Sequence, residues 1–98
     1  MNDMEGKMRK MRLETLISDC IVNDSECIIG ENHYKKISVN DLHPVEKKDL
    51  EDILYMAFYD DEDTAYTMNN LYRDENGHVI YFCSRSDAVF NLELGGQH

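Results

Sequence analysis

Carboxylate side chains are the residues of this 98-residue chain whose number and spacing most clearly indicate chemistry. The sequence has 20 Asp and Glu residues against 10 Lys and Arg residues, and its net charge is −10. Residues 41–63 alone carry −7 of that charge, and four carboxylates are adjacent in the run Asp60–Asp63. This concentration of negative charge attracts cationic partners. It repels nucleic acids and anionic membranes, because both present phosphate groups.

Catalytic motifs are missing from the sequence. The four histidines stand at positions 33, 43, 78 and 98, and none lies beside a serine or cysteine in a recognisable nucleophile motif. There is also no glycine-rich phosphate loop and no H-E-x-x-H pattern. A chain of this length has little room to build a pocket of roughly 300–1,000 Å³ beside its core. We therefore expect a protein that is not an enzyme and holds no cofactor.

The three cysteines predict reduced thiols rather than a metal site. An odd number of cysteines without a secretory signal is typical of a cytoplasmic protein. The candidate zinc ligands are Cys20, Cys27, His33 and Cys83. Their spacing is seven, six and fifty residues, whereas structural zinc sites pair ligands about two to four residues apart. The run Asp60–Asp63 does not begin a calcium-binding loop either, because the sixth position is Ala65 instead of glycine.

One helix, over residues 44–59, is predicted from a start signal and an apolar arc. Pro44 is the only proline of the chain, and proline fits the first position of a helix. His43 then takes the N-cap position, and Glu46 lies beside the positive end of the helix dipole. Apolar residues recur at helical spacing along this segment, at Leu50, Ile53, Leu54, Ala57 and Phe58.

The remaining periodic segments predict β-structure. Residues 66–84 form a hairpin closed at Asn76-Gly77, and residues 88–94 alternate as a further strand. Residues 27–39 indicate a second, smaller hairpin that turns at Gly30-Glu31-Asn32. An alternative for residues 64–71 is a helical continuation after the acidic run. The predicted fold class is α+β, an antiparallel sheet with helix 44–59 packed on one face.

The N-terminal residues are predicted to be either a helix or a loose extension. Four methionines and a second apolar set fall on opposite faces of a helical wheel, namely Met1, Met4, Met8 and Met11 against Leu13, Leu16, Ile17 and Cys20. We therefore divide the chain into a basic, Met-rich segment 1–12, a single domain 13–94 and a frayed tail 95–98. No run approaches the ~18 apolar residues of a membrane span.

A partner-binding surface is predicted on the outward arc of helix 44–59 and in the acidic run after it. Tyrosine and methionine are enriched at protein interfaces, whereas a merely solvated face favours Lys, Glu and Gln. The alternative is that the acidic run is a solvated loop or the start of a following helix. The predicted partner-binding residues are Asp49, Asp52, Tyr55, Met56, Tyr59, Asp60, Asp61, Glu62 and Asp63.

In size, acidity and lack of a catalytic motif, the chain resembles two groups of small proteins. One is the phage-encoded inhibitors such as anti-CRISPR proteins, and the other is the immunity proteins and antitoxins that cap nucleases. The resemblance implies an inhibitor that mimics nucleic-acid charge and blocks the basic surface of a nuclease or CRISPR effector. A different hypothesis is a self-associating regulatory module, a homodimer in which the basic segment Lys7–Arg12 meets the acidic surface of a second copy.

Overall fold

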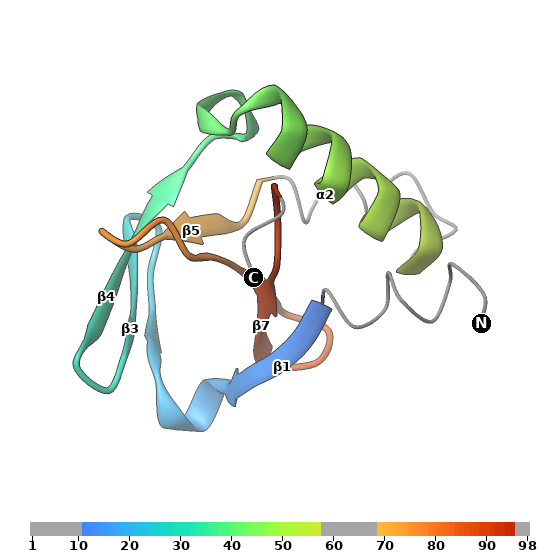
Figure 1. The fold of residues 1–98 in the computed structure, drawn as a ribbon. Coiled ribbons are helices and arrows are strands. Elements are labelled where there is room, and N and C mark those ends of the chain that lie inside the picture. The colour runs from blue at the N-terminus through green and yellow to red at the C-terminus, as the bar shows by residue number, and fades with distance from the viewer. Residues whose placement is uncertain (1–10, 58–68, 96–98) are drawn as a thin grey trace.

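The computed structural model describes residues 11–57 and 69–95, which form one seven-stranded antiparallel sheet with a helix against one face (Figure 1). The strand order is β1-β7-β6-β5-β4-β3-β2. The strands are β1 Met11–Leu16, β2 Ile21–Val22, β3 Glu26–Ile29, β4 Asn32–Ile37, β5 Leu71–Arg73, β6 Val79–Cys83 and β7 Ala88–Leu92. The helices are α2 Pro44–Ala57 and the 3-10 turns η1 Ile17–Asp19 and η2 Val39–Asp41. The expected small domain of sheet plus helix is confirmed, with more strand than the prediction contained.

Helix α2 begins at Pro44, as its start signal predicts. The apolar arc faces the sheet, and the side chains of Leu50, Ile53 and Leu54 are at most 2% exposed. The prediction is confirmed over residues 44–57, while residues 58 and 59 lie outside the described part of the chain. None of the described residues forms a helix with the length and apolar character needed to traverse a lipid bilayer.

Both predicted hairpins are present, with shorter strands than expected. β3 and β4 pair from Glu26↔Lys35 to Ile29↔Asn32, and the loop between them has Gly30 at a φ of 59°. β4 ends at Ile37 instead of residue 39, because Ser38 caps η2 and redirects the chain. β5 and β6 pair within the predicted hairpin 66–84, and β7 covers residues 88–92 of the predicted strand 88–94. The helical alternative for 64–71 is wrong at Leu71, which begins β5, and residues 64–68 are not described.

Residues 11–16 form strand β1, so the helical alternative for the N-terminal segment is wrong there. Leu13 lies opposite Phe90 and Leu16 opposite Ala88, but the register shifts between Leu13 and Thr15. This β-bulge inserts one residue and changes the alternation of side chains. Leu13 and Leu16 therefore face the same side of the sheet although they are three residues apart. That spacing made the strand look helical in the sequence.

The sheet curls strongly, because its two edge strands are neighbours in the sequence. Seven strands about 4.8 Å apart would span roughly 29 Å if the sheet were flat. Only residues 17–20 join β1 to β2, and this short, partly 3-10 connection cannot reach that far. Figure 1 shows β3 and β4 on one side of the curled sheet and β1 and β7 on the other. The backbone N–H of Ile17 donates to the carbonyl of Asp87 at 2.8 Å, which fixes η1 to the β6–β7 turn.

The curled sheet has an apolar cluster on each face. The helix-side cluster lies between α2 and the sheet and consists of Leu42, Leu50, Ile53, Leu54, Leu71, Val79, Tyr81, Leu92 and Leu94. The enclosed cluster lies inside the curl and consists of Cys27, Tyr34, Tyr72, Ile80 and Val89. The hydroxyl of Tyr72 donates to the carbonyl of Asn23 at 2.9 Å, which ties β5 to the β2–β3 turn. Because each face has its own cluster, consecutive residues are buried in the central strands, as at Val79, Ile80 and Tyr81 of β6.

Candidate functional site

The acidic surface predicted from the sequence starts at the N-terminus of α2, where Glu46 has an internal partner. Glu46 is only 4% exposed, and its two carboxylate oxygens lie 2.7 and 2.6 Å from Nη2 of Arg73 in β5. Its Oε1 also accepts from the backbone N–H of His43 at 3.0 Å. This buried ion pair joins the first turn of α2 to the sheet. Glu46 is therefore a structural residue of the acidic segment.

The surroundings of Glu46 keep its carboxylate charged. Burial alone would raise the pKa of Glu46, because a low-dielectric environment disfavours the charged form. The hydrogen bonds from Arg73 and His43, together with the positive charge of Arg73, outweigh burial and lower the pKa below its ordinary value. The Glu46 carboxylate is therefore charged, and available to pair with Arg73, at neutral pH.

Two further carboxylates of the acidic segment accept backbone hydrogen bonds. Asp49 accepts from the N–H of Gly95 at 2.9 Å, which fastens the chain after β7 to α2. Gly95 has a φ of 67°, and a Cβ at this position would lie 2.9 Å from the Cγ of Glu46. Asp41 accepts from the N–H of Ser38 at 2.8 Å and completes the capping box of η2. The acidity of residues 41–49 is thus partly explained by the fold.

The other predicted partner-binding residues are placed unequally by the structure. Asp52 is half-buried on α2, and its neighbour Glu51, which is not in the predicted set, is exposed. Tyr55 and Met56 belong to α2, but their side chains are outside the described part. The rest of the predicted set lies beyond it, namely Tyr59, Asp60, Asp61, Glu62 and Asp63. The structure thus brings Asp49 and Asp52 onto one helix, and the grouping of the remaining residues stays a prediction.

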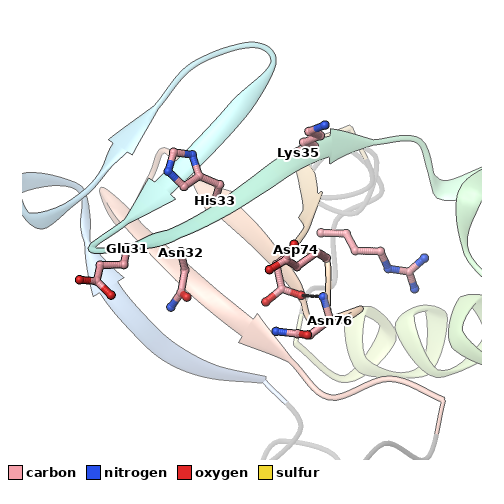
Figure 2. Close-up of a pocket in the computed structure, with 8 residues that line it drawn as sticks. Glu31, Asn32, His33, Lys35, Asp74 and Asn76 are labelled. Carbon is pink, nitrogen blue, oxygen red and sulfur yellow. Dashed lines mark hydrogen bonds between the residues drawn. The ribbon is translucent and has the colours of Figure 1, made fainter.

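A polar cavity of about 390 Å³ lies between the β3–β4 turn and the β5–β6 turn (Figure 2). Figure 2 shows Glu31 and Asn32 at one end of β4 and Asp74 and Asn76 of the neighbouring turn facing them. The lining residues are Glu31, Asn32, His33, Lys35, Arg73, Asp74, Glu75 and Asn76. A second cavity of about 410 Å³ lies on the α2 side of the same turn. Ligand pockets are mostly apolar, so these polar cavities resemble solvated grooves between loops.

The carboxylate of Asp74 forms hydrogen bonds within its own turn. Its Oδ1 accepts from the N–H of Asn76 at 3.0 Å and the N–H of His78 at 2.8 Å, and its Oδ2 lies 3.0 Å from Nδ1 of His78. Burial alone would raise the pKa of Asp74, but these hydrogen bonds and His78 lower it below its ordinary value. Among the described residues that line the 390 Å³ cavity, none has a hydroxyl or thiol side chain. The described lining therefore offers hydrogen bonds and charge.

The cysteines do not meet at one point. Cys27 belongs to the enclosed cluster with Cys20 packed against it, whereas Cys83 packs against the helix-side cluster on the other face. Burial raises the pKa of the Cys27 thiol to about 12, with the neighbouring Cys20 adding to the shift. Among the described residues, no group of three or more His, Cys, Asp or Glu side chains is placed to hold a metal ion. The sheet places Cys83 on the opposite face from Cys20 and Cys27, so the structure does not bring these three cysteines together.

The pairing of Arg73 with Glu46 and the position of the β5–β6 turn beside the two polar cavities were not predicted from the sequence. Residues 74–77 were recognised as turn residues, which is correct, but nothing in their spacing relates them to Glu31 or Glu46. The only local indication of this contact in the sequence was Glu46, an acid at the third position of the predicted helix. Comparisons of the chain with known protein families, with curated proteins and with solved structures gave no match.

Proposed function

We propose that this protein is a small acidic, non-enzymatic, cytoplasmic binding protein that occupies the basic nucleic-acid-binding surface of a partner such as a nuclease or CRISPR effector. The main observation that supports this proposal is the net charge of −7 in residues 41–63, which include α2 and the residues directly after it. Its acids would take the place of backbone phosphates. Tyr55, Met56 and Tyr59 would supply apolar and cation–π contacts to the arginine and lysine side chains of that surface.

Hydrogen bonds and ion pairs within the chain reduce the number of acids in residues 41–63 that we expect to contact a partner. Asp41, Glu46 and Asp49 hold the fold together, so they are poor candidates for contacts with a partner. Glu51 is exposed on α2, so we place the partner contacts on Glu51 and on the acids that follow the helix in sequence, Asp60–Asp63, with Lys47 and Lys48 as the cations nearby in sequence. Carboxylates that face solvent steer a cationic partner and speed its association, and salt weakens this effect.

The test is charge reversal with a matched control. One variant changes Asp60, Asp61, Glu62 and Asp63 to lysine. The control changes four exposed acids outside the segment, Asp19, Asp24, Glu31 and Glu75, and so has the same net charge. Tagged proteins are used to capture partners from host lysate at low and high salt, followed by competition with duplex DNA and with RNA.

The proposal expects captured nucleic-acid-binding proteins that DNA or RNA displaces, and their loss in the Asp60–Asp63 variant alone. Equal loss in both variants would mean that only net charge matters. Capture that nucleic acid does not displace would refute charge mimicry. If the captured protein is a toxic nuclease, the immunity-protein form of the proposal applies, and rescue of growth by co-expression checks it.

The self-associating alternative is tested by deletion of residues 1–10. Strand β1 begins at Met11, so a longer deletion would also remove strand residues and confuse the result. A fall in oligomer size on this deletion favours contact between the basic segment and the acidic surface. An unchanged size leaves the inhibitor proposal as the better explanation.

A further inference from the structure

Strand β1 presents a long sheet edge that has no partner strand among the described residues. It is the first strand in the sheet order and pairs with β7 on one side only. In a strand of six residues, about half of the backbone N–H and C=O groups point away from that neighbour. Such an edge can pair with a strand of another chain unless it is short, charged or covered.

The edge also carries exposed leucines. Leu13 is 58% exposed and Leu16 is 49% exposed. The β-bulge places both on the face that continues to Phe90 and Ala88 of β7. Leucines at an open edge are the side chains that an added strand would cover, and their burial would favour association.

The sequence of β1 is complementary to itself in an antiparallel arrangement. When two copies pair with Leu13 opposite Leu13, Arg12 of each copy lies opposite Glu14 of the other. Opposite charges directly across a strand pair stabilise it, whereas like charges oppose it. Arg12 also lies 2.6 Å from Glu93 of its own chain, and its guanidinium has enough donors to bind both carboxylates.

We propose that two copies of this chain associate through antiparallel pairing of their β1 edges, centred on Leu13. The contact is isologous, with Leu13 on the two-fold axis, Arg12–Glu14 pairs on both sides and Leu16 at the periphery. The bulge at Glu14 increases the local twist and keeps the paired stretch short, so the dimer is weak and dissociates on dilution. This edge is distinct from α2 and does not depend on the proposed function.

The oligomeric state is measured by sedimentation velocity over a concentration range from about 10 µM to 1 mM. We expect reversible dimerisation of the full chain, and at least about tenfold weaker association of Leu13→Lys. The control is Val45→Lys, because Val45 is 63% exposed at the start of α2 and is not part of the edge. This control is expected to dimerise like the original protein.

A charge-swap cycle then tests the register. Arg12→Glu and Glu14→Arg should each weaken dimerisation about tenfold, because each places like charges opposite one another. The double variant Arg12→Glu/Glu14→Arg should recover affinity to within about threefold. Repulsion between residue 12 and Glu93 is present in monomer and dimer alike, so it does not prevent this recovery. Circular dichroism checks that each variant is folded.

Three results would overturn the proposal. The first is a full-length protein that stays monomeric throughout the concentration range. The second is a dimer that Leu13→Lys leaves intact. The third is a charge-swap variant that associates no better than the two single variants. If only a variant without residues 1–10 dimerises, the chain's own N-terminal segment covers the edge and the proposal is wrong for the full-length protein.

Discussion

Replacing Arg73 with methionine tests the buried contact that fastens α2 to the sheet. Methionine retains much of the apolar length of the arginine side chain and removes its charge. The side chain of Glu46 is 5% exposed and that of Arg73 is 22% exposed. The variant therefore leaves a carboxylate in a nearly dry environment with His43 N–H as its remaining described donor.

The expected effect is a large loss of stability. Removing one member of a buried ion pair costs about 3–5 kcal/mol, because the other charge is left uncompensated. Since solvent still reaches part of Arg73, we expect the lower end, about 3 kcal/mol in the free energy of unfolding. For a domain of about 100 residues, this lowers Tm by roughly 12–24 °C.

Urea unfolding followed by circular dichroism at pH 7 measures the change. The matched control is Arg12→Met, which breaks a pair whose side chains are 61% and 34% exposed. We expect that control to cost less than about 1 kcal/mol, because exposed ion pairs contribute little. Adding Glu46→Gln to Arg73→Met removes the stranded charge and should recover part of the lost stability, giving a coupling of about 2 kcal/mol.

The pH dependence supplies a second readout. The pKa of Glu46 is lower in the folded protein than its ordinary value of 4.5, so the ion pair adds stability above that value. The added stability is lost as the pH falls through the folded pKa of Glu46. The difference between the original protein and Arg73→Met should therefore shrink in acid. A difference equal to that of Arg12→Met, or one that is the same at pH 7 and in acid, would refute the reasoning.

Three further predictions concern single positions. Gly95→Ala should lower the free energy of unfolding by about 2–3 kcal/mol, and Gly30→Ala by about 1 kcal/mol. Both glycines have a positive φ, but only at Gly95 would the added Cβ lie 2.9 Å from a side chain, that of Glu46. Equal losses would show that the close contact relaxes. Cys27 should stay unmodified by iodoacetamide at pH 8 in the folded protein and should react in urea, because burial raises its pKa to about 12. Mass spectrometry locates the label. Fast labelling of Cys27 in the folded protein would contradict its burial. In an ultraviolet pH titration, Tyr81 should ionise at a higher pH than free tyrosine, or only on unfolding, because burial raises its pKa. Ionisation at the pH of free tyrosine in the folded protein would contradict its place in the helix-side cluster.

Helix α2 and the hairpins were predictable because their signals are local. Pro44 fixes the backbone at the first helical position, and the apolar arc follows within four turns. Gly30 and Gly77 both have positive φ, which is the backbone geometry that marks the two turns. The boundaries were less accurate, because Ser38 ends β4 through a cap that the alternation of side chains does not reveal.

Strand β1 was missed because its β-bulge imitates helical spacing. Leu13 and Leu16 are three residues apart, and a regular strand would place them on opposite faces. Whether the extra residue is accommodated as a bulge depends on the partner strand β7, which lies more than 70 residues later in the chain. A local pattern does not contain that information.

The acidic residues show most clearly what the sequence alone determined and what only the tertiary structure decided. Their number and their concentration in residues 41–63 are properties of the sequence, because charge adds regardless of fold. Their roles depend on partners brought close by folding. Arg73 reaches Glu46 across 27 residues, and Gly95 reaches Asp49 across 46. Glu46 and Asp49 therefore stabilise the fold, whereas Glu51 stays exposed to solvent.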